Sequence, residues 1–320
     1  MKIVILDGFA VRPGDLSWER FQSLGEVVAY GHDNPDEFYE RLSGADVAVT
    51  NKVVFDRERI SRLPDLKLIA VAATGYNIID CEAAREHGVI VTNIPAYSTD
   101  SVAQMVFAHL LNITNRVQYY ADENHNGRWS KSPDFCYYDF TTHEIANQTL
   151  GIVGMGNIGT KVAAIANEFG MKVIAHTHRQ AETLPEGITK VELDELLATA
   201  DVITLHCPLT AESNRMINSE TIAKMKRGVV LINTGRGGLI DEQAVADALN
   251  DGQIGAFAAD VLTEEPPRSN NPLLTAKNSY LTPHIAWASY EARERLMDIM
   301  YDNIASFISG TPINVVNVLH

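Results

Sequence analysis

The sequence predicts an α/β protein with two domains, each built on a doubly wound parallel sheet. Three observations support this fold class. The chain has 320 residues, which exceeds the size at which a single hydrophobic core usually stops growing. Short apolar runs alternate with helical segments, as in parallel βαβ units. The alternation occurs in two series separated by a long helical segment and a polar stretch, so we expect one sheet from each series.

The first series covers residues 1–95, and its apolar runs are interpreted as buried strands. The segments between the runs are long enough for the helices that parallel crossovers need. The apolar run at the N-terminus is too short for a signal peptide, so we interpret it as the first strand. The expected strands are Lys2–Leu6, Val27–Tyr30, Val47–Thr50, Leu68–Ala73 and Val89–Ile94.

A long amphipathic segment, Ser98–Tyr120, joins the two series. Ser98, Thr99 and Ser101 offer N-cap chemistry at its start, and Ser101 with Gln104 has capping-box spacing. We expect one helix of roughly 30 Å, since an α-helix rises about 1.5 Å per residue.

The polar stretch 122–147 interrupts the alternation. Its aromatic side chains follow neither a helical nor a strand period, so we expect an ordered loop region that packs on another surface, such as the second subunit of a homodimer. These aromatic residues are Trp129, Phe135, Tyr137, Tyr138 and Phe140.

The second series begins at Thr149 and gives six expected strands with helices between them. Its first helix is expected over Thr160–Phe169, and a last helix over Tyr290–Ser309. Residues 1–98 with 285–320 should form one domain, and residues 99–284 the other. The expected strands are Leu150–Gly154, Lys172–His176, Val202–Cys207, Val229–Asn233, Ala256–Val261 and Tyr280–Thr282.

Composition excludes several classes of function. The formal net charge of −15 argues against nucleic acid and anionic membranes, because both require a basic surface. The chain has three widely spaced cysteines, which favours a reducing compartment and argues against a structural zinc site. No apolar stretch reaches the roughly 18 residues of a membrane helix. We therefore expect a cytoplasmic protein. The pair His176 and His178 is too small a ligand set for a metal, and no metal site is expected.

A GxGxxG motif follows the first strand of the second series, at Gly154, Gly156 and Gly159. In this context the first glycine permits a tight turn, the second lets a pyrophosphate approach the backbone, and the third lets helix and strand pack closely. The phosphates then lie at the helix N-terminus. The motif therefore predicts a dinucleotide site, and its place in mid-chain predicts a cofactor domain inserted between the two parts of another domain.

Four further motifs accompany Gly154–Gly159 in a fixed order: Ala73–Asp80 precedes it, and Asn233–Gly238, Asp260–Pro266 and Thr282–Ile285 follow it. With these motifs the chain closely resembles the D-isomer-specific 2-hydroxyacid dehydrogenases, and the resemblance covers nearly its whole length. Within that family, Leu6–Gly8, Pro133–Tyr137 and His284–Ala288 look most like the glycerate dehydrogenases, also called hydroxypyruvate reductases.

The resemblance implies a flavodoxin-like substrate domain and a Rossmann NAD(P)-binding domain with a cleft between them. It implies hydride transfer between NAD(P)H and a small 2-oxo or D-2-hydroxy acid. Hydroxypyruvate or glyoxylate, giving glycerate or glycolate, are the expected substrates.

The resemblance also implies three catalytic residues. Arg236 would bind the substrate carboxylate and carbonyl oxygen with its rigid fork of donors. His284 would be the general acid in reduction and the base in oxidation. Glu265 would pair with His284 and keep its proton available; it is chosen over Glu264 because it precedes Pro266, as in the family motif.

Binding roles follow from the same resemblance. Asp260 would contact the nicotinamide carboxamide, and the backbone N–H groups of 73–75 would bind the substrate carboxylate. The expected cofactor contacts are Gly154, Met155, Gly156, Asn157, Ile158, Gly159, Thr177, His178, Arg179, Cys207, Pro208, Thr234, Gly235, Arg236, Asp260 and His284. The expected substrate contacts are Ala73, Thr74, Gly75, Arg236, His284 and Trp287, the last as a pocket wall or a core residue.

The coenzyme preference is predicted from the second strand of the cofactor domain. NAD sites usually place an acidic residue about 20 residues past the glycines, where it bonds the ribose 2′-OH. Here Thr177 takes that position, and Arg179 could pair with a 2′-phosphate, with His178 as a further donor. We therefore favour NADP(H) over NAD(H).

Five alternatives share parts of this pattern. Formate dehydrogenases carry a glutamine where Glu265 stands, and phosphoglycerate dehydrogenases often carry an extra domain for which 320 residues leave little room. C-terminal-binding-protein corepressors share the fold and motifs, so a non-enzymatic NAD(H)-binding module stays possible, as does a D-lactate-type dehydrogenase. A Rossmann methyltransferase would have no use for Arg236, Glu265 and His284 together.

Overall fold

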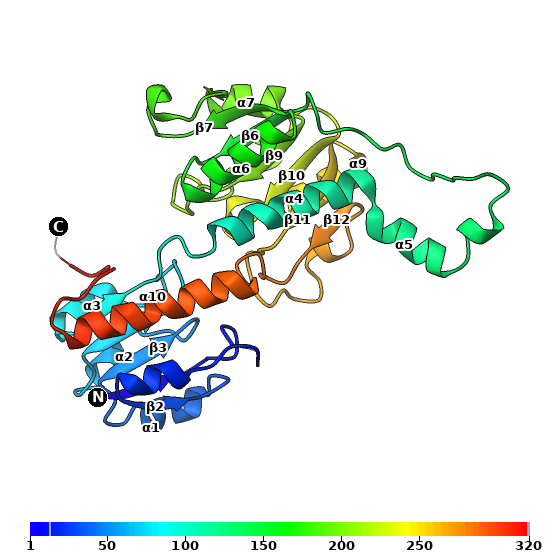
Figure 1. Ribbon diagram of the computed structural model, residues 1–320. Coiled ribbons are helices and arrows are strands. Elements are labelled where there is room, and N and C mark those ends of the chain that lie inside the picture. The colour runs from blue at the N-terminus through cyan, green and yellow to red at the C-terminus, as the bar shows by residue number, and fades with distance from the viewer. Residues whose placement is uncertain (13, 319–320) are drawn as a thin grey trace. The chain divides into compact units, whose positions relative to one another are not determined.

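The computed structural model describes residues 1–12 and 14–318. Contacts divide the chain into two compact units, residues 1–98 with 288–320 and residues 99–287 (Figure 1). The boundary at which the chain returns to the first unit therefore falls after residue 287 rather than after the expected 284. The reason is local, because the N–H groups of Ile285 and Ala286 donate to the carboxylate of Asp260 and bind this segment to the second unit.

The first unit contains a five-stranded parallel sheet in the order β2-β1-β3-β4-β5. This is the flavodoxin-like order, as expected, and the order reverses at β1. β3 and β4 are buried along their whole length, which explains why every residue in them except Thr50 is apolar. The strands are β1 (Lys2–Ile5), β2 (Glu26–Ala29), β3 (Val47–Thr50), β4 (Leu68–Val71) and β5 (Ile90–Thr92).

Short helices connect these strands, and a long C-terminal helix, α10 (Tyr290–Ile308), packs on β4. Side-chain caps mark the helix starts: Asp80 accepts the N–H of Ala83, and Ser289 accepts the N–H of Ala292. The other helical segments are η1 (Glu19–Ser23), η2 (Pro35–Glu37), α1 (Phe38–Arg41), α2 (Arg57–Ser61) and α3 (Cys81–Glu86).

The second unit contains a seven-stranded parallel sheet in the order β12-β11-β10-β9-β6-β7-β8. This is the Rossmann order with one strand added beyond β11, and its switch point lies between β6 and β9. The short edge strand β8 was not predicted. The strands are β6 (Thr149–Val153), β7 (Lys172–His176), β8 (Ile188–Lys190), β9 (Val202–Leu205), β10 (Val229–Asn233), β11 (Ile254–Ala259) and β12 (Ser279–Leu281).

Helices cover both faces of this sheet (Figure 1). α6 begins at Asn157, directly after its N-cap residue Gly156, which is earlier than the expected start at Thr160. The helical segments are α6 (Asn157–Glu168), η4 (Ala181–Thr183), α7 (Leu193–Thr199), α8 (Ser219–Ile222), η5 (Gly237–Leu239), α9 (Glu242–Asp251) and η6 (Pro272–Leu274).

The single long helix expected over 98–120 was wrong. The structure has α4 (Thr99–Asn115) and α5 (Val117–His125), separated by Arg116 in the left-handed conformation at φ +50°. Two features explain the break. The hydroxyl of Thr114 bonds back to the carbonyl of Leu110 and weakens the last turn of α4. α5 buries no residue, so no apolar face holds it in line with α4.

The segment after α5 contains η3 (Trp129–Lys131) and then runs without regular structure to β6. Figure 1 shows α5 and this segment reaching away from the sheet of the second unit. Within the described residues, no helix combines the length and the apolar character needed to cross a membrane.

Candidate active site

Three neighbouring strands, β10, β11 and β12, end at one edge of the second sheet. Arg236 follows β10, Asp260 follows β11 directly, and His284 follows β12. Parallel α/β sheets bind their ligands beyond this carboxyl edge. The strand order therefore brings together chemistry that lies up to 48 residues apart in the chain.

His284 and Glu265 form a hydrogen-bonded pair. Nδ1 of His284 lies 2.6 Å from Oε2 of Glu265, and the two side chains are 29% and 32% exposed. The other carboxylate oxygen of Glu265 accepts the N–H of Leu262 at 3.0 Å, which fixes the carboxylate. No hydrogen bond among the described residues uses Nε2 of His284, so this nitrogen can exchange a proton with a ligand.

Arg236 lies in a loop that is held against the Glu265 loop. Its backbone carbonyl accepts from Asn233, and its guanidinium donates to the carbonyl of Gly235 while remaining exposed. At Gly237, an added Cβ would lie 2.0 Å from the carbonyl carbon of Leu262. Only glycine permits this close approach, and the N–H of Leu262 is the group that binds Glu265.

The carboxylate of Asp260 is buried and already accepts three hydrogen bonds. Its donors are the hydroxyl of Thr282 at 2.6 Å and the N–H groups of Ile285 at 2.9 Å and Ala286 at 2.7 Å. These donors lie on both sides of His284 in the chain. The carboxylate expected to face the nicotinamide therefore also anchors the segment that carries His284.

The glycine-rich loop has the geometry of a dinucleotide site. Gly154 has φ +98°, and an added Cβ would lie 2.6 Å from the nitrogen of Cys207. At Gly159 a Cβ would lie 2.1 Å from the carbonyl oxygen of Gly154, so the loop and α6 pack without space for a side chain. Above Gly156, in contrast, nothing lies within 4 Å. The backbone is thus open where a pyrophosphate would approach α6.

The comparisons with known proteins agree with this geometry. A family model described as D-isomer specific 2-hydroxyacid dehydrogenase, NAD binding domain, matches residues 107–286. A hydroxypyruvate reductase of Blautia hydrogenotrophica is 44% identical over 99% of this chain and 100% of its own length. A glycerate dehydrogenase of Methylorubrum extorquens is 44% identical over 98% of both chains.

The chain belongs to the D-isomer-specific 2-hydroxyacid dehydrogenase family.

Among solved structures, an acyclic imino acid reductase in complex with NADPH and D-Arg matches with a TM-score of 0.85 and 34% identity, over 99% of this chain and 100% of that one. These likenesses confirm the predicted enzyme class, an oxidoreductase that uses a nicotinamide dinucleotide and acts on a small acid. A non-enzymatic module and a methyltransferase are therefore set aside.

The residues expected beside the adenosine follow the ends of β7 and β9. Arg179 donates to the carbonyl of Met155 in the glycine loop at 3.2 Å, and its own carbonyl accepts from Lys190 at 2.7 Å. Thr177 and His178 precede it in the same turn. Lys190, on the unpredicted strand β8, is a second cation beside Arg179. The sequence did not indicate this role for Lys190.

Further contacts lie along the path expected for the dinucleotide. Burial raises the pKa of the Cys207 thiol, so this residue is an uncharged wall beside Gly154, followed by Pro208. The hydroxyl of Thr234 is buried and has no hydrogen-bond partner among the described residues. An unpaired buried hydroxyl at the end of β10 fits a cofactor that would supply its partner.

The loop 73–75 belongs to the first unit of the dehydrogenase. Thr74 donates its hydroxyl to the carbonyl of Ile94 at 2.7 Å, and its carbonyl accepts from Asn93 at 2.8 Å. No hydrogen bond within the described chain uses the N–H of Ala73, Thr74 or Gly75 as a donor. The loop is therefore fixed, with its N–H groups available for an anion.

Trp287, the last residue of the second unit, is half-buried. The residues expected at the site thus come from both units, with Ala73, Thr74 and Gly75 in the first and the others in the second.

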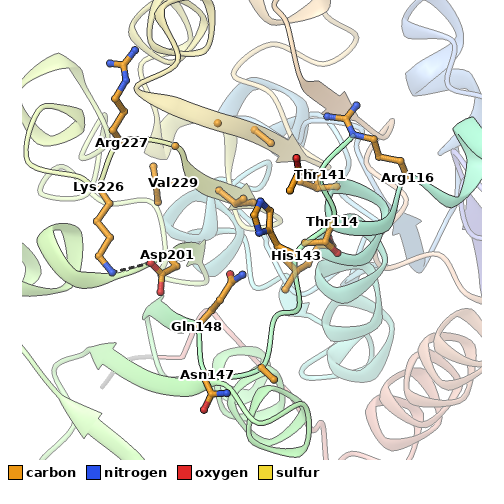
Figure 2. A pocket seen from close by; sticks show the side chains of 17 residues that line it. Thr114, Arg116, Thr141, His143, Asn147, Gln148, Asp201, Lys226, Arg227 and Val229 are labelled. Atoms are coloured by element: carbon orange, nitrogen blue, oxygen red, sulfur yellow. Dashed lines mark hydrogen bonds and ion pairs between the residues drawn. The ribbon is translucent and has the colours of Figure 1, made fainter. Parts of the chain in front are cut away.

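A separate cavity of about 600 Å³ lies at the opposite edge of the second sheet (Figure 2). Its lining includes Val229, where β10 begins, and the end of α4. Figure 2 shows Lys226 paired with Asp201 at one side of this cavity and Arg116 at the other. None of the residues expected at the active site lines it.

Proposed function

We propose that this dehydrogenase reduces hydroxypyruvate and glyoxylate to glycerate and glycolate. The names of the two relatives that share 44% identity over nearly the whole chain support this substrate class. The observation that carries the proposal is the 2.6 Å pair of His284 and Glu265 at the strand edge where Arg236 also lies.

Each of these side chains has a distinct task. The exposed guanidinium of Arg236 binds the substrate carboxylate and polarises the carbonyl oxygen. His284 gives a proton from Nε2 to that oxygen in reduction and removes it in oxidation. Glu265, fixed by Leu262, holds the imidazole through Nδ1 and stabilises its protonated form.

A bound nicotinamide supplies or accepts the hydride at C2 of the acid. Gly154, Gly156 and Gly159 hold its pyrophosphate, and Thr234 and Asp260 lie beside the nicotinamide end. The free N–H groups of 73–75 suit an anion such as the substrate carboxylate, and we assign Trp287 to a wall of the substrate pocket.

The test is a panel of 2-oxo acids assayed with NADH and with NADPH. We expect the highest kcat/KM for hydroxypyruvate or glyoxylate. A clear preference for pyruvate would instead favour a D-lactate-type enzyme. No turnover with any 2-oxo acid would contradict the proposal.

We further propose that the dehydrogenase prefers NADP(H). The guanidinium of Arg179 bonds the glycine loop, and Lys190 bonds the turn that carries Arg179. Thr177 occupies the position where NAD sites usually carry an acidic residue. A single charge-assisted pair with a 2′-phosphate contributes about 1.5–3 kcal/mol, which is tenfold or more in affinity. We expect Arg179→Ala to lower kcat/KM for NADPH about tenfold and to leave the value for NADH nearly unchanged. A wild type that prefers NADH would refute the preference.

We also propose a homodimer. Phe135 and Tyr138, on the segment after α5, are 89% and 79% exposed, which is unusual for side chains of this size on a free surface. The measurement is the molecular mass in solution by light scattering, for the wild type and for Phe135→Ser with Tyr138→Ser. We expect a dimer that the double substitution weakens. A wild-type monomer at micromolar concentration would contradict this.

A further inference from the structure

The backbone at His284 has an unusual conformation. Its φ is +54°, a left-handed value that a non-glycine residue adopts only where its surroundings enforce it. The side chain of such a residue leaves the chain in a direction that ordinary extended or helical backbone would not allow. Whatever holds this φ therefore also sets where the imidazole points.

The carboxylate of Asp260 bonds the chain on both sides of this residue. Oδ1 accepts the hydroxyl of Thr282, two residues before His284, and the N–H of Ile285, one residue after it. Oδ2 accepts the N–H of Ala286. Asp260 is only 2% exposed, so solvent does not compete for these bonds.

A histidine on α4, His109, adds a further hydrogen bond to this network. Nε2 of His109 lies 3.3 Å from Oγ1 of Thr282. Because Thr282 donates its only proton to Asp260, Nε2 of His109 must carry the hydrogen of this contact. Burial lowers the pKa of His109, so at neutral pH it is a neutral ring with a single N–H to donate.

The geometry points to Asp260, Thr282 and His109 as positioning residues that hold the backbone of His284 in its left-handed conformation and so aim its imidazole. His109 orients the Thr282 hydroxyl, Thr282 orients the carboxylate, and the carboxylate fixes the chain on either side of His284. This inference rests on the proposed role of His284 as the proton donor. It goes further by giving a task to two residues that touch neither Glu265 nor Arg236.

The test variant is Thr282→Val, which keeps the shape of the side chain and removes the hydroxyl. We expect kcat for hydroxypyruvate to fall by about 10- to 100-fold, the scale of a misplaced catalytic group. The dissociation constant of NADPH should change much less than kcat, because the carboxylate of Asp260 keeps its two backbone donors. Thr282→Ser should restore most of the activity.

The matched control is Thr92→Val. The Thr92 hydroxyl is also buried but has no hydrogen-bond partner among the described residues, so this variant should retain wild-type kcat. A second variant, His109→Leu, removes the donor to Thr282 without altering the loop. It should lower kcat about threefold, again with unchanged NADPH binding.

A double-mutant cycle separates this inference from the proposed function. In a His284→Ala background, Thr282→Val should cause little further loss, because the group it positions is absent. Wild-type kcat in both Thr282→Val and His109→Leu would overturn the inference, as would an undiminished effect of Thr282→Val in the His284→Ala background. Normal turnover of His284→Ala alone would instead overturn the proposed function.

Discussion

The imidazole of His284 is held by two carboxylates that act in different ways. Glu265 bonds the ring itself, while Asp260 bonds the backbone before and after the residue. The first could be predicted from sequence, because a glutamate before proline belongs to a recognisable motif. The second could not, because an aspartate at a strand end looks the same whether it faces a cofactor or its own chain.

Charge on Glu265 should matter more than its shape. Glu265→Gln keeps the size of the side chain but removes the negative charge beside the imidazolium. Nδ1 of His284 then loses the charged acceptor that holds the ring, so proton transfer in reduction should be less efficient. We expect kcat/KM for reduction to fall at least about tenfold.

The measurement is kcat/KM for the reduction of hydroxypyruvate at neutral pH. Glu264→Gln is the matched control, since Glu264 pairs with Arg268 on the surface and not with His284. A kcat/KM of Glu265→Gln equal to that of the control would refute the pairing.

His206 links stability to pH. Burial lowers the pKa of this histidine to about 4, below the value near 6.5 expected in the unfolded chain. The unfolded chain therefore binds the proton more readily, and the folded state loses stability as the pH falls from about 6.5 towards 4. At pH 5 the loss from this residue is about 2 kcal/mol.

Urea unfolding at pH 7 and pH 5 measures this effect. His206→Gln should reduce the difference in unfolding free energy between the two pH values by about 2 kcal/mol. His87→Gln, at an exposed histidine, should leave the difference unchanged. An equal pH dependence in wild type and His206→Gln would show that His206 does not titrate in this way.

At the scale of elements, apolar runs located the strands well, and the helix break was missed. A run such as Val229–Asn233 is largely buried and almost entirely apolar, as expected for a central strand of a parallel sheet. The break at Arg116 depends on tertiary packing, because α5 has no apolar face to keep it on the sheet. Strand β8 is too short for its apolar content to stand out.

The glycine loop permits a sharp separation of binding from folding. A Cβ at Gly156 would meet no atom of the protein, and its φ of −79° is suitable for alanine. Gly156→Ala should therefore keep or slightly raise Tm. It should weaken NADPH binding at least about tenfold, because the methyl group occupies the approach of the pyrophosphate.

Gly31→Ala is the control for this prediction, as it also adds a Cβ in open space but in the first unit. It should change neither Tm nor NADPH binding. Unchanged NADPH affinity in Gly156→Ala would show that the pyrophosphate does not approach this glycine.

At the scale of the whole molecule, a chain with net charge −15 binds a dinucleotide and an organic acid that are both anions. Local groups must overcome the unfavourable field, and we propose that Arg236, Arg179 and the unpaired N–H groups of 73–75 do so. The sequence was sufficient to predict the two sheets, since their apolar runs mark most of the strands. The buried contacts of Thr282 and His109 join residues 173 positions apart and have no local pattern.

We propose that His284 exchanges the proton while its neighbours bind and orient the substrate. The most direct measurement compares NADPH oxidation by hydroxypyruvate in the wild type, in His284→Ala and in His87→Ala, with NADPH affinity measured on each protein. We predict that His284→Ala lowers kcat at least about 100-fold with unchanged NADPH affinity, and that His87→Ala behaves as the wild type. Near-normal turnover in His284→Ala would contradict the account.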